Sequence, residues 1–177
     1  GAGPIAGTAL AQHSLVERMD FTGGTATGVA IARAIAASGR VKPLCAELGG
    51  NAPVLVFEDA RSVAEAVDGV AFAAFVASGQ TCVSGKRVLV QRGVWDEFVK
   101  GLVSKAAALR LGDPLSAETD LGPLISKTHQ ERVHAQVMRA RDGGAEILVG
   151  GRAPDAARCS LAGVGHFYEP TVLGAVS

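Results

Sequence analysis

The 177-residue chain has no excess of either charge, few aromatic residues and few cysteines. Its 17 Lys and Arg residues balance its 17 Asp and Glu residues, whereas a nucleic-acid binder usually carries a basic excess. Aromatic residues make up only 5% of the chain, too few for a surface that stacks on bases. The same neutrality excludes a polybasic membrane-surface protein and an acidic tail. We therefore expect neither a nucleic-acid partner nor a membrane partner.

Several chemical frameworks are also missing. Three cysteines without a CxxC pair favour neither a disulfide framework nor a structural zinc site, and the chain has no HExxH or GxSxG motif. The longest apolar run, residues 70–77, is far shorter than the roughly 20 residues of a transmembrane helix. These absences predict a cytoplasmic protein with reduced thiols and without a metal site.

The residues that the chain does have are small and apolar. Hydrophobic residues make up 48% and glycine accounts for 23 positions, so the chain can build a core and is too apolar for disorder. Its mean hydropathy of +0.27 is high for its size. It begins Gly-Ala-Gly-Pro, with neither an initiator Met nor a signal peptide. Both features are expected of a piece of a larger protein, whose core faces would pack against parts outside the chain.

Stretches typical of strands alternate with stretches typical of helices, which predicts an α/β fold with parallel pairing. The pattern predicts strands over 18–21, 44–48, 53–57, 86–91, 145–149 and 167–173. It predicts helices over 26–37, 63–78, 95–111 and 128–142. The continuous apolar run over 53–57 is typical of a buried strand. The second half of the 63–78 helix is apolar all round, and we expect it to be buried too.

Three segments could carry chemistry, and each has a plain structural alternative. Glycines over 20–28 lie between a strand and a helix N-terminus, which favours an anion site or an ordinary tight turn. Glu47 ends an apolar segment, as a general base or an exposed strand-end carboxylate would. Cys82 lies among small residues past an apolar helix, as a reactive thiol or a buried structural cysteine would. The opening GAGPIA fits the GxGxxA spacing, but no strand precedes it.

Taken together and in order, FTGGTATG, ELGG and GQTC resemble the NAD(P)-dependent aldehyde dehydrogenase superfamily, with Glu47 and Cys82 35 positions apart. The similarity continues through KRVLV, LGDPLSAETDLGPLIS and HFYEPTVL, and so covers nearly the whole chain. The resemblance implies an aldehyde-dehydrogenase-like α/β fold, of which this chain is about the middle third. Residues 1–49 would end a Rossmann-type NAD(P)-binding domain, and residues 50–177 would begin a catalytic domain that is incomplete here.

The resemblance also implies roles for individual residues. Cys82 matches the nucleophile that attacks the aldehyde, and its backbone N–H matches half of the oxyanion hole. Glu47 matches the base that activates water to release a carboxylic acid. The cofactor would be NAD or NADP, and the partner a small-molecule aldehyde substrate. The positions that match cofactor contacts are Gly3, Pro4, Thr22, Gly23, Gly24, Thr25, Gly28, Leu48 and Gly49.

The chain departs from the family at Gly24, where the family usually has Ser, so a hydroxyl contact to phosphate is lost. The oxyanion-hole Asn and several cofactor contacts of the family would lie outside the chain. One missing oxyanion donor costs about 10²–10³ in rate, so we expect the 177-residue chain alone to be inactive. The full-length enzyme would form a homodimer or homotetramer.

Two alternatives remain open at this point. Relatives that pass the acyl group to coenzyme A commonly lack the Glu of ELGG, so the presence of Glu47 favours hydrolysis. A non-catalytic nucleotide-binding protein on the same scaffold would be expected to have lost Glu47 or Cys82, and neither is lost.

Overall fold

The computed structural model describes residues 1–176 as an α/β protein built of two compact units, Gly1–Gly50 and Asn51–Ser177. Each unit has its own parallel strand pair. The assignment of these units to a cofactor domain and a catalytic domain stays a prediction. No helix within residues 1–176 is both long enough and apolar enough to cross a membrane.

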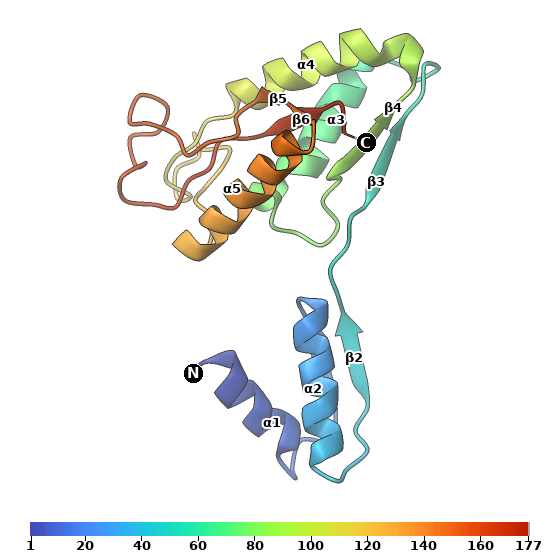
Figure 1. Ribbon diagram of the computed structural model, residues 1–177, viewed down its shortest axis with the longest axis vertical. Helices are drawn as coiled ribbons and strands as arrows, with labels where there is room; N and C mark the ends of the chain where they lie inside the picture. The colour runs from blue at the N-terminus through green and yellow to red at the C-terminus, as the bar shows by residue number, and fades with distance from the viewer. Residues whose placement is uncertain (177) are drawn as a thin grey trace. The chain divides into compact units, whose positions relative to one another are not determined.

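The first unit is organised around two short parallel strands. In chain order it contains η1 (Gly3–Gly7), α1 (Thr8–Gln12), β1 (Met19–Thr22), α2 (Thr25–Ala37) and β2 (Leu44–Glu47). Parallel strands need a crossover connection, and α2 supplies it, lying alongside β2 in Figure 1. The register places Met19 opposite Leu44 and Thr22 opposite Glu47. The two strands therefore end at the same edge of the sheet.

A buried lysine ties the start of this unit to the approach to β2. Lys42 is only 8% exposed, and its Nζ donates hydrogen bonds to the carbonyl oxygens of Ala11 at 2.8 Å and His13 at 2.7 Å. The last carbonyls of a helix lack partners within the helix, and a cation near them is favourable. Lys42 thus satisfies the end of α1 and holds it against the segment before β2.

The second unit has two parallel strands packed against two helices. The strands are β3 (Pro53–Val56) and β4 (Arg87–Val90), and the helices are α3 (Val63–Phe75) and α4 (Trp95–Ala108), as Figure 1 shows. Ser62 starts α3 by accepting a hydrogen bond from the Glu65 N–H at 3.3 Å. The core of this unit consists of Val56, Val67, Val70, Ala71, Phe98 and Leu102.

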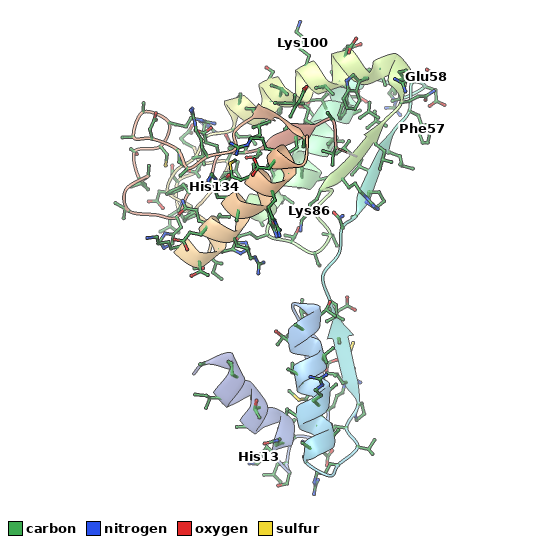
Figure 2. All side chains as sticks on the ribbon, viewed as in Figure 1. His13, Phe57, Glu58, Lys86, Lys100 and His134 are labelled. Carbon is green, nitrogen blue, oxygen red and sulfur yellow. The ribbon has the colours of Figure 1, made fainter. Side chains whose placement is uncertain are left out.

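The rest of the second unit packs around a smaller core of Leu111, Leu121, Cys159 and Phe167. Its helix α5 (Lys127–Asp142) is capped by Ser126, and its strands β5 (Glu146–Val149) and β6 (Val172–Gly174) pair antiparallel. His134 on α5, labelled in Figure 2, places its Nδ1 3.0 Å from the hydroxyl of Tyr168. Burial and the nearby charge of Glu169 raise the pKa of Tyr168 to about 12, so this phenol stays protonated.

The elements that the sequence predicted are present, but two predictions about their surroundings are wrong. Phe72 in the second half of α3 is 72% exposed, and β3 is only partly buried, with Leu55 59% exposed. Phe57, just past β3 in Figure 2, is 57% exposed. The reason is that α3 and α4 cover one face of the two-stranded β3–β4 sheet, and residues 51–176 supply no cover for these side chains.

Three elements have a boundary that differs from the prediction by more than one residue, and one of them, the helix expected over 95–111, ends at Ala108. The helix expected over 63–78 ends at Phe75, because Ala77 and Ser78 adopt left-handed backbone angles that an α-helix cannot contain. The strand expected over 167–173 begins only at Val172 and ends one residue later than expected, at Gly174. Phe167 lies before it and is buried in the smaller core instead.

Candidate active site

The turn between β1 and α2 gathers four of the predicted cofactor positions: Thr22, Gly23, Gly24 and Thr25. The N–H of Gly23 donates to the carbonyl oxygen of Glu47 at 3.0 Å, which continues the β1–β2 ladder into the turn. Gly24 is the N-cap of α2, and no side chain caps this helix. Its first N–H groups and the positive end of its dipole therefore face the turn without a capping side chain, which suits an anion.

Gly28 lets α2 approach the end of β2. A Cβ placed on Gly28 would lie 3.0 Å from Cδ2 of Leu48, so a larger residue would push Leu48 away. Leu48 directly follows β2, which brings it and Glu47 to the edge where the β1–α2 turn begins. In open α/β sheets, ligands bind outside the carboxyl ends of parallel strands. The structure thus brings together seven predicted residues in one unit: Thr22, Gly23, Gly24, Thr25, Gly28, Glu47 and Leu48.

Of the two alternatives predicted for Glu47, the structure shows the exposed strand-end carboxylate. Its side chain is exposed, and no ion pair or side-chain hydrogen bond within residues 1–176 involves its carboxylate. The other alternative, a general base in apolar surroundings, is not seen within Gly1–Gly50, because β2 lies in a two-stranded sheet and three of its 4 residues are exposed. Glu47 is therefore a strand-end carboxylate open to solvent in this unit.

The remaining predicted cofactor residues are not hydrogen-bonded to the β1–α2 turn. Gly3 and Pro4 are exposed and begin η1, a π-helical turn held by the carbonyl of Ala2. Gly49 is exposed in the loop after β2. Among the hydrogen bonds of residues 1–176, none joins Gly3, Pro4 or Gly49 to the β1–α2 turn.

Cys82 lies in the second unit, exposed on a short turn between α3 and β4. The hydroxyls of Thr81 and Ser84 are 2.6 Å apart, and Ser84 is only 1% exposed. The N–H of Gly85 donates to the carbonyl of Ala73 in α3 at 2.9 Å, and Lys86 (Figure 2) leads on into β4. Of the two predicted alternatives, the structure shows an accessible thiol. The buried cysteine is Cys159, at 2% exposed.

Sequence reasoning missed the strained segment that leads to this turn. Ala77, Ser78 and Gly79 are consecutive residues with φ of 51°, 55° and 69°. Left-handed angles cost L-residues about 1–2 kcal/mol each, and only Gly adopts them freely. Such strain persists where the surrounding structure holds it, and it clusters at functional sites. Gly79 was the one signal in the sequence, because glycine commonly follows a helix end.

Three features of the fold and the site belong together. An α/β chain carries an anion-favouring turn and a carboxylate at the end of one parallel strand pair, and an accessible thiol on a fixed turn beside another. The whole chain, residues 1–177, matches the model of the Aldehyde dehydrogenase family, and it belongs to that family.

Relatives and solved structures agree with this membership. The chain is 40% identical over 177 residues to 5-carboxymethyl-2-hydroxymuconate semialdehyde dehydrogenase of Escherichia coli, covering 99% of this chain and 36% of the relative. It is 41% identical over 172 residues to betaine aldehyde dehydrogenase of Bacillus subtilis, covering 97% of this chain and 34% of the relative. The chain therefore spans about a third of the length of the curated relatives it matches.

Solved structures of the family superpose closely on the chain. A putative aldehyde dehydrogenase from Burkholderia cenocepacia matches with a TM-score of 0.90 at 38% identity, over 98% of this chain and 34% of that one. Betaine aldehyde dehydrogenase from Staphylococcus aureus, solved in complex with NAD+, matches with a TM-score of 0.91 at 34% identity, over 100% of this chain and 34% of that one.

The packing of Gly85 generates a prediction about the turn that carries Cys82. A Cβ on Gly85 would lie 2.6 Å from Cγ2 of Val54 in β3, so Gly85→Ala should lower the free energy of unfolding by about 1–3 kcal/mol. Gly69 lies in α3 with open space around it, and Gly69→Ala should raise stability by about 0.5–1 kcal/mol. Urea unfolding of the chain measures both. Equal effects of the two substitutions would contradict the close packing at Gly85.

Proposed function

We propose that the polypeptide containing this chain oxidises an aldehyde to a carboxylic acid with NAD+ or NADP+. The observation that carries the proposal is the presence of both Glu47 and Cys82, within ELGG and GQTC, in a chain that belongs to the family along its whole length. The names of the relatives support an aldehyde substrate, and the NAD+ complex of the Staphylococcus aureus neighbour supports the cofactor. Gly1–Gly50 would then be part of the cofactor domain, and Asn51–Ser177 part of the catalytic domain.

The proposed nucleophile is the Cys82 thiolate. Its sulfur attacks the carbonyl carbon of the aldehyde, and the carbonyl π-electron pair moves to oxygen, which gives a thiohemiacetal oxyanion. The backbone N–H of Cys82 donates to this oxyanion, where it stabilises charge that develops during the reaction. The support is the position of Cys82 on an exposed turn that Ser84 and Gly85 fix to the core. A nucleophile needs both access and a defined position.

The residues of the β1–α2 turn fit a dinucleotide. The open space around Gly24 and the uncapped N-terminus of α2 would accept the pyrophosphate, and Leu48 and Gly49 would lie beside the nicotinamide. When bound, NAD+ or NADP+ supplies the acceptor for the hydride that leaves the thiohemiacetal carbon, which becomes a thioester.

Glu47 then completes the proposed reaction. Its carboxylate takes a proton from water, whose oxygen attacks the thioester carbon. Collapse of the resulting intermediate breaks the carbon–sulfur bond and releases the carboxylic acid and the Cys82 thiolate. The exposed carboxylate at the end of β2 supports this role, because water can reach it and no internal ion pair within residues 1–176 competes for it.

The nucleophile assignment predicts the effect of Cys82→Ala in the complete polypeptide. Aldehyde-dependent NAD(P)H formation should fall by about 10⁴-fold or more, because no other group replaces the attacking sulfur. The matched control is Cys45→Ser, which removes the other exposed thiol and should leave the rate unchanged. Absorbance at 340 nm with a panel of aldehydes measures both variants. Sustained turnover by Cys82→Ala would show that the nucleophile is another group.

The base assignment predicts a different defect for Glu47→Gln, which keeps the size of the side chain and removes its basicity. The steady-state rate should fall by about 10²–10⁴-fold, whereas a single burst of NAD(P)H should remain because thiohemiacetal and thioester formation do not use Glu47. Rapid-mixing absorbance separates the burst from the steady state. Product analysis of the unsubstituted enzyme with and without coenzyme A supplies the control. An acyl-coenzyme A product would contradict hydrolysis.

The cofactor site predicts the effect of a hydroxyl at position 24. Gly24→Ser should bind NAD+ or NADP+ about 3- to 10-fold more tightly, because the added hydroxyl can donate to a phosphate oxygen at the helix N-terminus. Gly24 has φ −72°, and a Cβ there would meet nothing within 4 Å, so Gly24→Ala is a control of matched backbone without the hydroxyl. Isothermal titration of the complete polypeptide compares the three proteins. Identical affinities for the Ser and Ala variants would argue against a phosphate at this turn.

A further inference from the structure

The segment Ala77–Gly79, whose residues have left-handed backbone angles, is flanked by hydrogen bonds to another loop, residues 122–125. The Ser78 hydroxyl donates to the carbonyl oxygen of Gly122 at 3.1 Å. The Ile125 N–H donates to Oε1 of Gln80 at 3.3 Å. These two hydrogen bonds join segments that are 44 and 45 positions apart in the sequence. They flank Gly79 and end two residues before Cys82.

The 122–125 loop is itself anchored. The Leu124 N–H donates to the carbonyl of His166 at 2.9 Å, and Nε2 of Gln130 in α5 donates to the carbonyl of Phe167 at 2.5 Å. Phe167 is 2% exposed and belongs to the smaller core. Pro123 adds a fixed φ to the loop. The loop therefore presents a firm backbone to Ser78 and Gln80.

From this arrangement we propose that Ser78 and Gln80 are positioning residues for Cys82, acting as a latch between the strained turn and the 122–125 loop. The latch holds Ala77 and Ser78 in angles that they would leave if released, and so sets the direction of the chain at Cys82. Both the sulfur and the backbone N–H of Cys82 depend on that direction. A displacement of about 1 Å can cost about 10²-fold in rate. The catalytic part of this inference rests on the proposed function.

The test compares variants of the complete polypeptide. Ser78→Ala and Gln80→Met each remove one hydrogen bond, and each should lower kcat about 3- to 10-fold with KM for the aldehyde unchanged. The double variant should lower kcat about 10- to 100-fold. Amide hydrogen exchange should become faster within residues 76–82, because local opening of the turn costs less without the latch. The melting temperature should change little, because the two cores are untouched.

Two further variants separate positioning from a general structural effect. Gln80→Glu keeps an acceptor oxygen for the Ile125 N–H, so it should reach the wild-type maximal rate, with a pH–rate profile displaced to higher pH because a carboxylate disfavours a nearby thiolate. Gln91→Met is the matched control. Gln91 also accepts a backbone N–H through Oε1, from Glu58 at 2.9 Å, but at the other end of β4. This variant should leave kcat and exchange over 76–82 unchanged.

Each outcome decides the inference. Unchanged kcat and unchanged exchange in the double variant, with Cys82→Ala inactive, would refute the latch and leave the proposed function intact. Faster amide exchange throughout Asn51–Ser177 with a lower melting temperature would show that Ser78 and Gln80 stabilise the whole unit, and would refute a specific role in positioning Cys82. Turnover by Cys82→Ala would refute the proposed function and the catalytic role of the latch together. Should Gln80→Met fail to fold, Ser78→Ala and Gln80→Glu decide between these results.

Discussion

Parallel pairing of β1 with β2 is the constraint on which the candidate cofactor site depends. Because the strands run in the same direction, Thr22 and Glu47 end opposite each other, and the turn after Thr22 opens beside Leu48. An antiparallel pair would have sent these residues to opposite edges. The crossover that parallel pairing requires is α2, and its N-terminus is the part that favours an anion. Parallel pairing of β1 with β2 thus brings the turn, the N-terminus of α2 and the carboxylate of Glu47 to the same edge of the sheet.

The second unit uses the same topology for a different purpose. Here β3 and β4 are joined through α3, and the connection from α3 into β4 carries Cys82. Close packing of Gly85 against Val54 and the buried hydroxyl of Ser84 keep this connection on the core. The thiol is consequently exposed on a backbone that has little freedom. The Cys82 side chain is accessible, whereas the neighbouring residues Ser84 and Gly85 fix the position of its backbone.

The sequence was informative wherever chemistry requires a particular residue type. Glu47 and Cys82 could be proposed from the sequence because a base and a nucleophile need a carboxylate and a thiol, and their short motifs occur in a known order. The left-handed angles of Ala77 and Ser78 could not be found, because neither residue type favours them and the contacts that hold them come from 44 and 45 positions away. The exposure of Phe72 and Leu55 was also hidden. An apolar pattern in the sequence predicts which face of an element is hydrophobic. Whether that face is buried depends on what packs against it in the tertiary structure.

The register of β3 against β4 also governs the order in which the second unit can form. Pro53 pairs with Arg87, so the ribosome must extend the chain through all of α3 before the first strand contact exists. A helix forms from local contacts much sooner than two distant segments meet. By shortening the connection, α3 brings the strand ends together and lowers the entropy lost on pairing. We therefore expect the helix that leads to the proposed nucleophile to form before the two strands pair.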